Sequence, residues 1–204
     1  MNKRALLFCV WLFVLVSVLT GCSGPANMQS NVEVGERIKF VASNSTTATY
    51  RVVRLANGTI AYKWEHGDLT SAEVNYLHSR VVKEYVVLKI RNAALKYNCH
   101  SYAWYSKSTG NKYWIDDPSK FSSKADVVFT QQPKSAKLPA AAKKDDRVIY
   151  YNGNKKDHSA IVYKPNIKGE NLISKWGFSG LYSHSINNCP YYLSAAKIEY
   201  YRLP

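Results

Sequence analysis

The sequence is poor in cysteine, and this shortage limits how the fold can be cross-linked. Only four cysteines occur among 204 residues, and two of them, Cys9 and Cys22, lie in the N-terminal leader region. Beyond residue 31, only Cys99 and Cys189 remain. In an oxidising compartment these two could pair with each other, so a Cys99–Cys189 disulfide is one expectation for the folded domain.

Acidic residues are also scarce. Fourteen of them stand against 28 lysines and arginines, which gives a formal net charge of +14. Loss of Lys3 and Arg4 with the leader lowers this charge to +12. A cationic surface attracts anions, and for an exported domain we expect acidic lipid headgroups and anionic envelope polymers as partners, not nucleic acid. Alternatively, the charge only keeps the surface solvated.

The sequence lacks a transmembrane segment at its N-terminus, because the apolar run of residues 5–18 is too short to span a bilayer. Lys3 and Arg4 precede this run and Leu19-Thr20-Gly21-Cys22 follows it, so residues 1–21 read as a signal peptide. The tetrapeptide resembles the lipobox of bacterial lipoproteins. That resemblance implies lipid attachment at Cys22, export, and anchoring to a bacterial membrane, with residues 22–31 as a tether. An ordinary secretory signal is the alternative.

No internal repeat and no long low-complexity segment occurs in the remaining chain. About 180 mature residues suffice for one domain with a sizeable core. Residues 32–85 contain strand-like stretches joined at Asn57-Gly58 and an amphipathic helix starting at Ser71. We predict an N-terminal extension here, or a small separate domain, and a main domain over residues 86–204.

The stretch of residues 97–104, Tyr-Asn-Cys-His-Ser-Tyr-Ala-Trp, carries the main chemical signal. Asn98 is a preferred helix N-cap, which places Cys99 in the first turn of a helix. The helix dipole favours a thiolate at that position, and the thiolate is the nucleophilic form of cysteine. The alternatives are a buried inert thiol and half of a disulfide. His100 is turned about 100 degrees from Cys99 and is expected to be structural or substrate-facing.

About 60 residues after Cys99, His158 opens an apolar strand, and this order suits a cysteine nucleophile with a histidine base. Strand alternation places His158 and Ala160 on one face, and Ser174 and Trp176 on one face of the next strand. If Ala160 pairs opposite Ser174, then Ser174 comes within reach of His158.

These motifs resemble the papain-like amidohydrolases and peptidases of the CHAP and NlpC type. The resemblance implies an α+β fold, with an N-terminal catalytic helix packed on an antiparallel sheet. It further implies that Cys99 attacks an amide and that His158 is its base. The residues Ser174-Lys175-Trp176-Gly177 are similar to the Asn-Ser-Trp-Gly of papain-like enzymes, which makes Ser174 the expected third catalytic residue. Serine is shorter than asparagine, and His184 is the alternative third residue.

The functional prediction is a membrane-anchored cysteine amidase or peptidase without cofactor or metal. Its expected substrate is an amide of the cell envelope, in the stem peptide of peptidoglycan. The competing prediction is a non-catalytic basic lipoprotein that uses the same fold as a binding module. The order Cys99 then His158 favours the enzyme, whereas the short Ser174 and the spare Cys189 favour the binding module.

Overall fold

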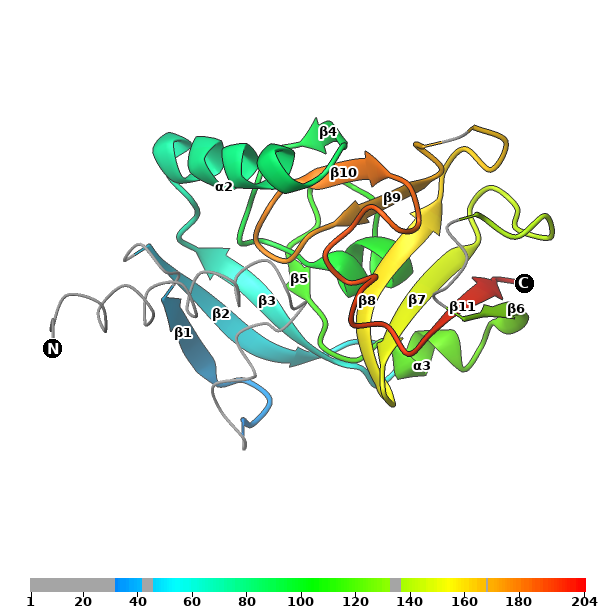
Figure 1. Ribbon diagram of the computed structural model, residues 1–204. Coiled ribbons are helices and arrows are strands. Elements are labelled where there is room, and N and C mark those ends of the chain that lie inside the picture. The colour runs from blue at the N-terminus through cyan, green and yellow to red at the C-terminus, as the bar shows by residue number, and fades with distance from the viewer. Residues whose placement is uncertain (1–31, 42–45, 133–136, 168) are drawn as a thin grey trace, which may run out of the picture.

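Two antiparallel sheets form most of the structure (Figure 1), a computed structural model that describes residues 32–41, 46–132, 137–167 and 169–204. The strand order is β1-β2-β3-β5 in the four-stranded sheet and β4-β10-β9-β8-β7-β11-β6 in the seven-stranded sheet. The leader, the tether and Cys22 lie outside the described residues.

The four-stranded sheet is built from β1 (Arg37–Val41), β2 (Thr47–Arg54), β3 (Ile60–His66) and β5 (Tyr113–Trp114). The hairpin expected at Asn57-Gly58 joins β2 to β3 and is confirmed. Gly58 has a φ of +84°, a left-handed conformation that costs glycine little, and the side chain of Asn57 accepts a hydrogen bond from the amide of Thr59 at 3.1 Å.

The helix expected from Ser71 is α2 (Ser71–Glu84), and its start follows the sequence signals. Thr70 caps it, because the Thr70 hydroxyl accepts from the Glu73 amide while the Glu73 carboxylate accepts from the Thr70 amide. Leu77 and Val81 are buried on one face of the helix. Val81 reaches the core of the seven-stranded sheet. Although α2 lies within the predicted N-terminal extension, it therefore packs on the predicted main domain.

The seven-stranded sheet contains β4 (Leu88–Arg91), β6 (Asp126–Gln131), β7 (Arg147–Asn152), β8 (Lys155–Val162), β9 (Leu172–Lys175), β10 (Leu181–His184) and β11 (Lys197–Arg202). A tight turn at Asn152-Gly153 joins β7 to β8, with a φ of +58° at Gly153. The C-terminal strand β11 lies inside the sheet between β7 and β6. The lysine-rich connection before β7 contains α3 (Ser119–Ser122) and the edge strand β6.

Side-chain alternation along these strands gives the seven-stranded sheet two different apolar faces. One face, here called the helix side, packs against Tyr97, Tyr102, Ala103 and Trp104 around the short helix η2 (Ser101–Tyr105). The other, called the loop side, packs against residues of α2 and of the β10–β11 connection. The strand residues of the loop side are Val148, Tyr150, Ala160, Val162, Leu172, Tyr182, Ile198 and Tyr200.

The predicted α+β papain-like architecture is wrong. Within the described residues the chain is mostly β, with two antiparallel sheets and three short helices, α2, α3 and η2, and not a papain-like arrangement with a long catalytic helix. The physical reason lies after Cys99, where the helical stretch ends at Tyr105 because Ser106 is already extended, with a φ of −153° and a ψ of +126°. The tyrosine-rich alternating segments that follow then add strands to the sheet.

Candidate functional site

Asn98 forms the start of the helical stretch of residues 99–105, as its type predicts. Its side-chain oxygen accepts from the amide of Ser101 at 3.0 Å, the N-cap bond, and its backbone oxygen accepts from the amide of Tyr102 at 2.9 Å. The Asn98 amide group also donates to the carbonyl of Ile115 at 2.7 Å. Cys99 therefore occupies the first helical position. The helix continues with the wider π-helical turn η2, a feature that is frequent at functional sites.

Cys99 differs from its helical neighbours in the face of the sheet that it contacts. Tyr97, Tyr102 and Trp104 pack on the helix side, whereas Cys99 is fully buried in the core of the loop side. Paired residues of β8 and β9 are limited to Ile161 with Ile173 and Val162 with Leu172.

The redox state of Cys99 bears directly on its chemistry. Cys99 is disulfide-bonded in the structure. The expected Cys99–Cys189 disulfide does not form, because Cys189 is a free, buried thiol. Burial raises the pKa of the Cys189 thiol to about 12, so it is protonated and unreactive at neutral pH.

His158 lies on the loop side, opposite Tyr150 in the β7–β8 ladder. It is fully buried, and its ring stacks on Tyr191 with centroids 3.8 Å apart and an angle of 5° between the planes. Burial, followed by the proximity of His184 and His100, lowers the pKa of His158 well below its ordinary value. The imidazole is therefore neutral at physiological pH, the form that can accept a proton.

His100 ties the start of the helix to the strand that carries His158. Its Nδ1 lies 2.8 Å from the hydroxyl of Ser159, and its Nε2 donates to the carbonyl of Lys156 at 3.0 Å. Trp104 donates to the same serine hydroxyl at 2.9 Å. Because Ser159 follows His158, these bonds hold Cys99 and His158 in neighbouring stretches of backbone. His100 thus has the structural role that was one of its two expected roles.

Ser174 shares the loop side with His158 but bonds a different histidine. Its hydroxyl lies 2.7 Å from Nε2 of His184 and accepts from the indole N–H of Trp176 at 3.0 Å. Nδ1 of His184 donates to the carbonyl of Ser185 at 2.8 Å, which leaves Nε2 to accept from Ser174. Burial lowers the pKa of His184 to about 4. Ser174 therefore orients His184, and its expected hydrogen bond to His158 is not observed.

The point at which the β8–β9 ladder ends explains why Ser174 does not bond His158. The observed pairs have the register that sets Ala160 opposite Ser174, but the ladder stops one pair earlier, at Ile161 and Ile173. Ser174 is paired on its other side with Tyr182 of β10, two residues before His184. Lys175 points to the helix side, where its ammonium group lies 5.4 Å from the centre of the Tyr97 ring.

Substrate access requires movement, because Cys99, His158, Ser174 and His184 are all fully buried. The stacked Tyr191 belongs to the connection between β10 and β11, which crosses the loop side of the sheet (Figure 1). Tyr191 was not anticipated from the sequence, since nothing in Cys-Pro-Tyr-Tyr marks a partner for a distant histidine.

In the part of the chain that the structure describes, no group of three or more His, Cys, Asp or Glu residues could hold a metal ion. No helix in that part is both long and apolar enough to cross a bilayer. Comparisons with family models, with curated proteins and with solved structures find no match to this chain.

Proposed function

We propose that this protein is a membrane-anchored cysteine hydrolase that cleaves an amide bond in the cell envelope. The observation that carries the proposal is the position of Cys99. It begins a capped helix on one side of the sheet, yet its side chain belongs to the core on the opposite side, which His158 shares.

In the proposed reaction, neutral His158 accepts the proton of the Cys99 thiol as sulfur attacks the carbonyl carbon of the amide. The amide of Cys99 at the helix start donates to the developing oxyanion. Collapse of the tetrahedral intermediate breaks the C–N bond, and His158 returns the proton to the leaving amine. Water, deprotonated by His158, then hydrolyses the thioester and regenerates the thiol.

The reaction needs Cys99 as a thiol, whereas Cys99 in the structure is disulfide-bonded. A small thiol such as dithiothreitol would release it by exchange, with oxidation of the added thiol. We therefore expect hydrolysis by the unprocessed chain only after reduction. In the proposed mature lipoprotein, Cys9 is removed with the leader, Cys22 is acylated and Cys189 is a free thiol, so no cysteine of the chain remains to pair with Cys99 and no reduction is needed.

The net charge of the mature protein supports the proposed substrate, and the leader supports the proposed location. A mature net charge of +12 suits an anionic envelope polymer, and the lipobox-like Leu19–Cys22 supports export and a lipid anchor at Cys22. The proposed substrate is the stem peptide of peptidoglycan, an amide-rich component of that compartment.

The test is release of new amino groups from purified peptidoglycan by the full chain, before and after treatment with dithiothreitol. Activity should appear only in the reduced protein, and Cys99→Ser should abolish it. His158→Ala should lower the rate by about 10²- to 10⁴-fold, the usual contribution of a positioned base. Cys189→Ala and His66→Ala are matched controls, since Cys189 is a protonated buried thiol and His66 is exposed on β3, and both should retain activity.

Alkylation by iodoacetamide near pH 6 adds a readout that needs no substrate. Reduced Cys99 should react faster than Cys189, and His158→Ala should slow it to the rate of an ordinary thiol. Superimposable pH profiles for wild type and His158→Ala, together with no amine release, would overturn the proposal.

The second candidate is a non-catalytic basic binding lipoprotein. The disulfide at Cys99 favours it, because a disulfide-bonded sulfur has no nucleophilic thiolate. Under this alternative the reduced and oxidised proteins bind envelope material equally and neither releases amines.

A further inference from the structure

A second candidate site lies outside the Cys99–His158 region, at the end of the sheet where β8 connects to β9. It is a pocket of about 520 Å³, within the range of small-ligand sites. Its walls come from the β8–β9 connection, from the segment before β7 and from the start of the β10–β11 connection. The lining residues are Lys137, Leu138, Pro165, Asn166, Ile167, Gly169, Asn171, Ser185 and Asn187.

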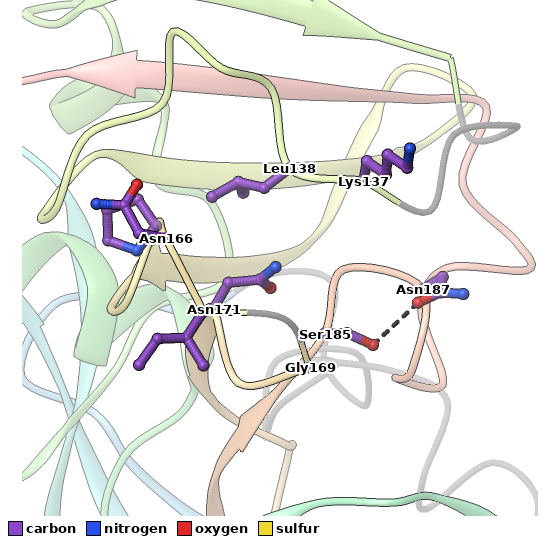
Figure 2. A pocket seen from close by; sticks show the side chains of 9 residues that line it. Lys137, Leu138, Asn166, Gly169, Asn171, Ser185 and Asn187 are labelled. Atoms are coloured by element: carbon purple, nitrogen blue, oxygen red, sulfur yellow. Dashed lines mark hydrogen bonds between the residues drawn. The ribbon is translucent and has the colours of Figure 1, made fainter.

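The polar lining is almost entirely uncharged. Three asparagines and one serine contribute it, and among the described lining residues Lys137 alone is ionisable. Figure 2 shows Asn171 between Asn166 on one side and the hydrogen-bonded pair of Ser185 and Asn187 on the other. Amide side chains both donate and accept, so they complement a neutral ligand that also does both.

Asn171 gives a specific reason to expect a ligand. It is only 7% exposed, and its side-chain oxygen is buried without a hydrogen-bond partner, although the side chain lines the pocket. An unsatisfied buried acceptor is unfavourable. Rotation about the last side-chain bond, which is soft in asparagine, would turn this oxygen towards an N–H or O–H donor in the pocket.

The apolar part of the lining limits the ligand further. Leu138, Pro165 and Ile167 supply it, and Ile167 is 48% exposed. Apolar groups facing a row of amides suit a ligand with a methyl or ring C–H surface on one side and amide or hydroxyl groups on the other. A free amino terminus or a basic side chain would bring a positive charge beside Lys137, which this lining does not match.

We propose that this pocket binds an N-acetylated amino sugar, with the acetamido group paired to Asn171 and its methyl group on Leu138 and Ile167. This inference goes beyond the proposed hydrolase activity and does not depend on it. The site also adjoins the buried histidines, because the carbonyl of Ser185, a lining residue, accepts the Nδ1 proton of His184. A sugar that contacts Ser185 would therefore lie next to His184, the partner of Ser174.

The test is titration of the full chain with the trimer of N-acetylglucosamine, followed by calorimetry. Saturable binding is expected, and Asn171→Ala should weaken it about tenfold, in line with loss of one buried hydrogen bond. Because the Asn171 oxygen bonds nothing in the protein, this variant should fold; thermal melting checks that. Ile167→Ser, at an exposed position, should weaken binding several-fold without affecting the fold.

Asn152→Ala is the matched control, since Asn152 is exposed at the end of β7, outside the pocket. It should bind the trimer like wild type. The glucosamine trimer, which lacks the acetyl groups and is cationic, should not bind. The proposal is overturned if the wild type shows no saturable binding, if both trimers bind equally, if a neutral peptide binds instead, or if folded Asn171→Ala binds as well as wild type. Repeating the titration with Cys99→Ser keeps this result separate from any failure of the hydrolase.

Discussion

At the scale of single residues, the buried histidines set how the protein responds to acid. Burial lowers the pKa of both His100 and His184 to about 4, whereas an unfolded histidine titrates near 6.5. Between these values the unfolded chain binds more protons, so stability is full above pH 6.5 and is lost as the pH falls towards 4. Each histidine should lower the free energy of unfolding by about 3 kcal/mol over this window. Urea unfolding at pH 7, 5.5 and 4 measures this loss in the free energy of unfolding.

A variant isolates the share of one histidine. His100→Gln keeps a side-chain donor and acceptor but cannot titrate, so its stability should fall less steeply with acid than that of wild type. His66→Gln, at an exposed position on β3, should leave the slope unchanged. Equal slopes for all three proteins would mean that His100 is not buried in its neutral form.

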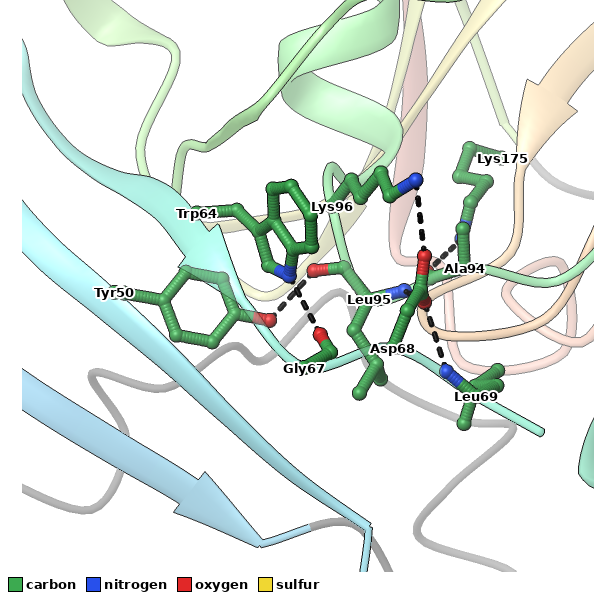
Figure 3. Close-up of polar contacts among 9 residues, drawn as sticks. All are labelled: Tyr50, Trp64, Gly67, Asp68, Leu69, Ala94, Leu95, Lys96 and Lys175. Carbon is green, nitrogen blue, oxygen red and sulfur yellow. Dashed lines mark hydrogen bonds and ion pairs between the residues drawn. The ribbon is translucent and has the colours of Figure 1, made fainter.

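At the scale of elements, the segment before the Cys99 helix connects the two sheets (Figure 3). Tyr50 of β2 donates to the carbonyl of Leu95 at 2.5 Å, and the carboxylate of Asp68 accepts from the amide of Leu95 at 2.8 Å. Lys175 of β9 donates to the carbonyl of Ala94 at 3.0 Å. Tyr50→Phe leaves a buried carbonyl unsatisfied, so the free energy of unfolding should drop by about 1–3 kcal/mol. Urea unfolding at neutral pH measures the loss.

The same substitution at Tyr76 is the control for this element. Tyr76 is 43% exposed on α2, and Tyr76→Phe should change stability by less than about 0.5 kcal/mol. Hydrogen exchange gives a second readout, because Tyr50→Phe should speed exchange of the amides of residues 98–105. Unchanged exchange there would mean that the segment does not position the Cys99 helix.

At the scale of the whole molecule, the proposed lipid anchor and the positive charge should contribute separately to membrane binding. The Cys22→Ser protein, without an acyl group, should no longer fractionate tightly with membranes. It should still bind anionic vesicles at low salt, and this binding should fall steeply between 0.1 and 1 M salt, as the Debye length shrinks from about 10 Å to about 3 Å. Sedimentation with vesicles measures both effects.

Neutral vesicles are the control and should not retain the Cys22→Ser protein at either salt concentration. If Cys22→Ser remains as firmly bound to membranes as the wild type, the lipobox interpretation is wrong. Equal vesicle binding at low and high salt would assign the interaction to an uncharged receptor instead.

Local features of this protein were determined by the sequence itself. The hairpin at Asn57-Gly58, the capped start of α2 and the N-cap at Asn98 depend on residues within a few positions of one another, and each was found as expected. Strand alternation also correctly put Ala160, Leu172 and Trp176 on one face of the sheet, because that pattern has a period of two in any strand.

Only the tertiary structure decided how these pieces meet. The β8–β9 ladder ends one pair before Ser174, so Ser174 bonds His184 while His158 stacks on Tyr191. Likewise, β11 lies between β7 and β6, and the pocket beside Asn171 combines three segments far apart in sequence. The physical reason is that such contacts depend on where a strand pair stops and which distant segment covers it. These choices are made by packing of the whole core, and no short sequence pattern encodes them.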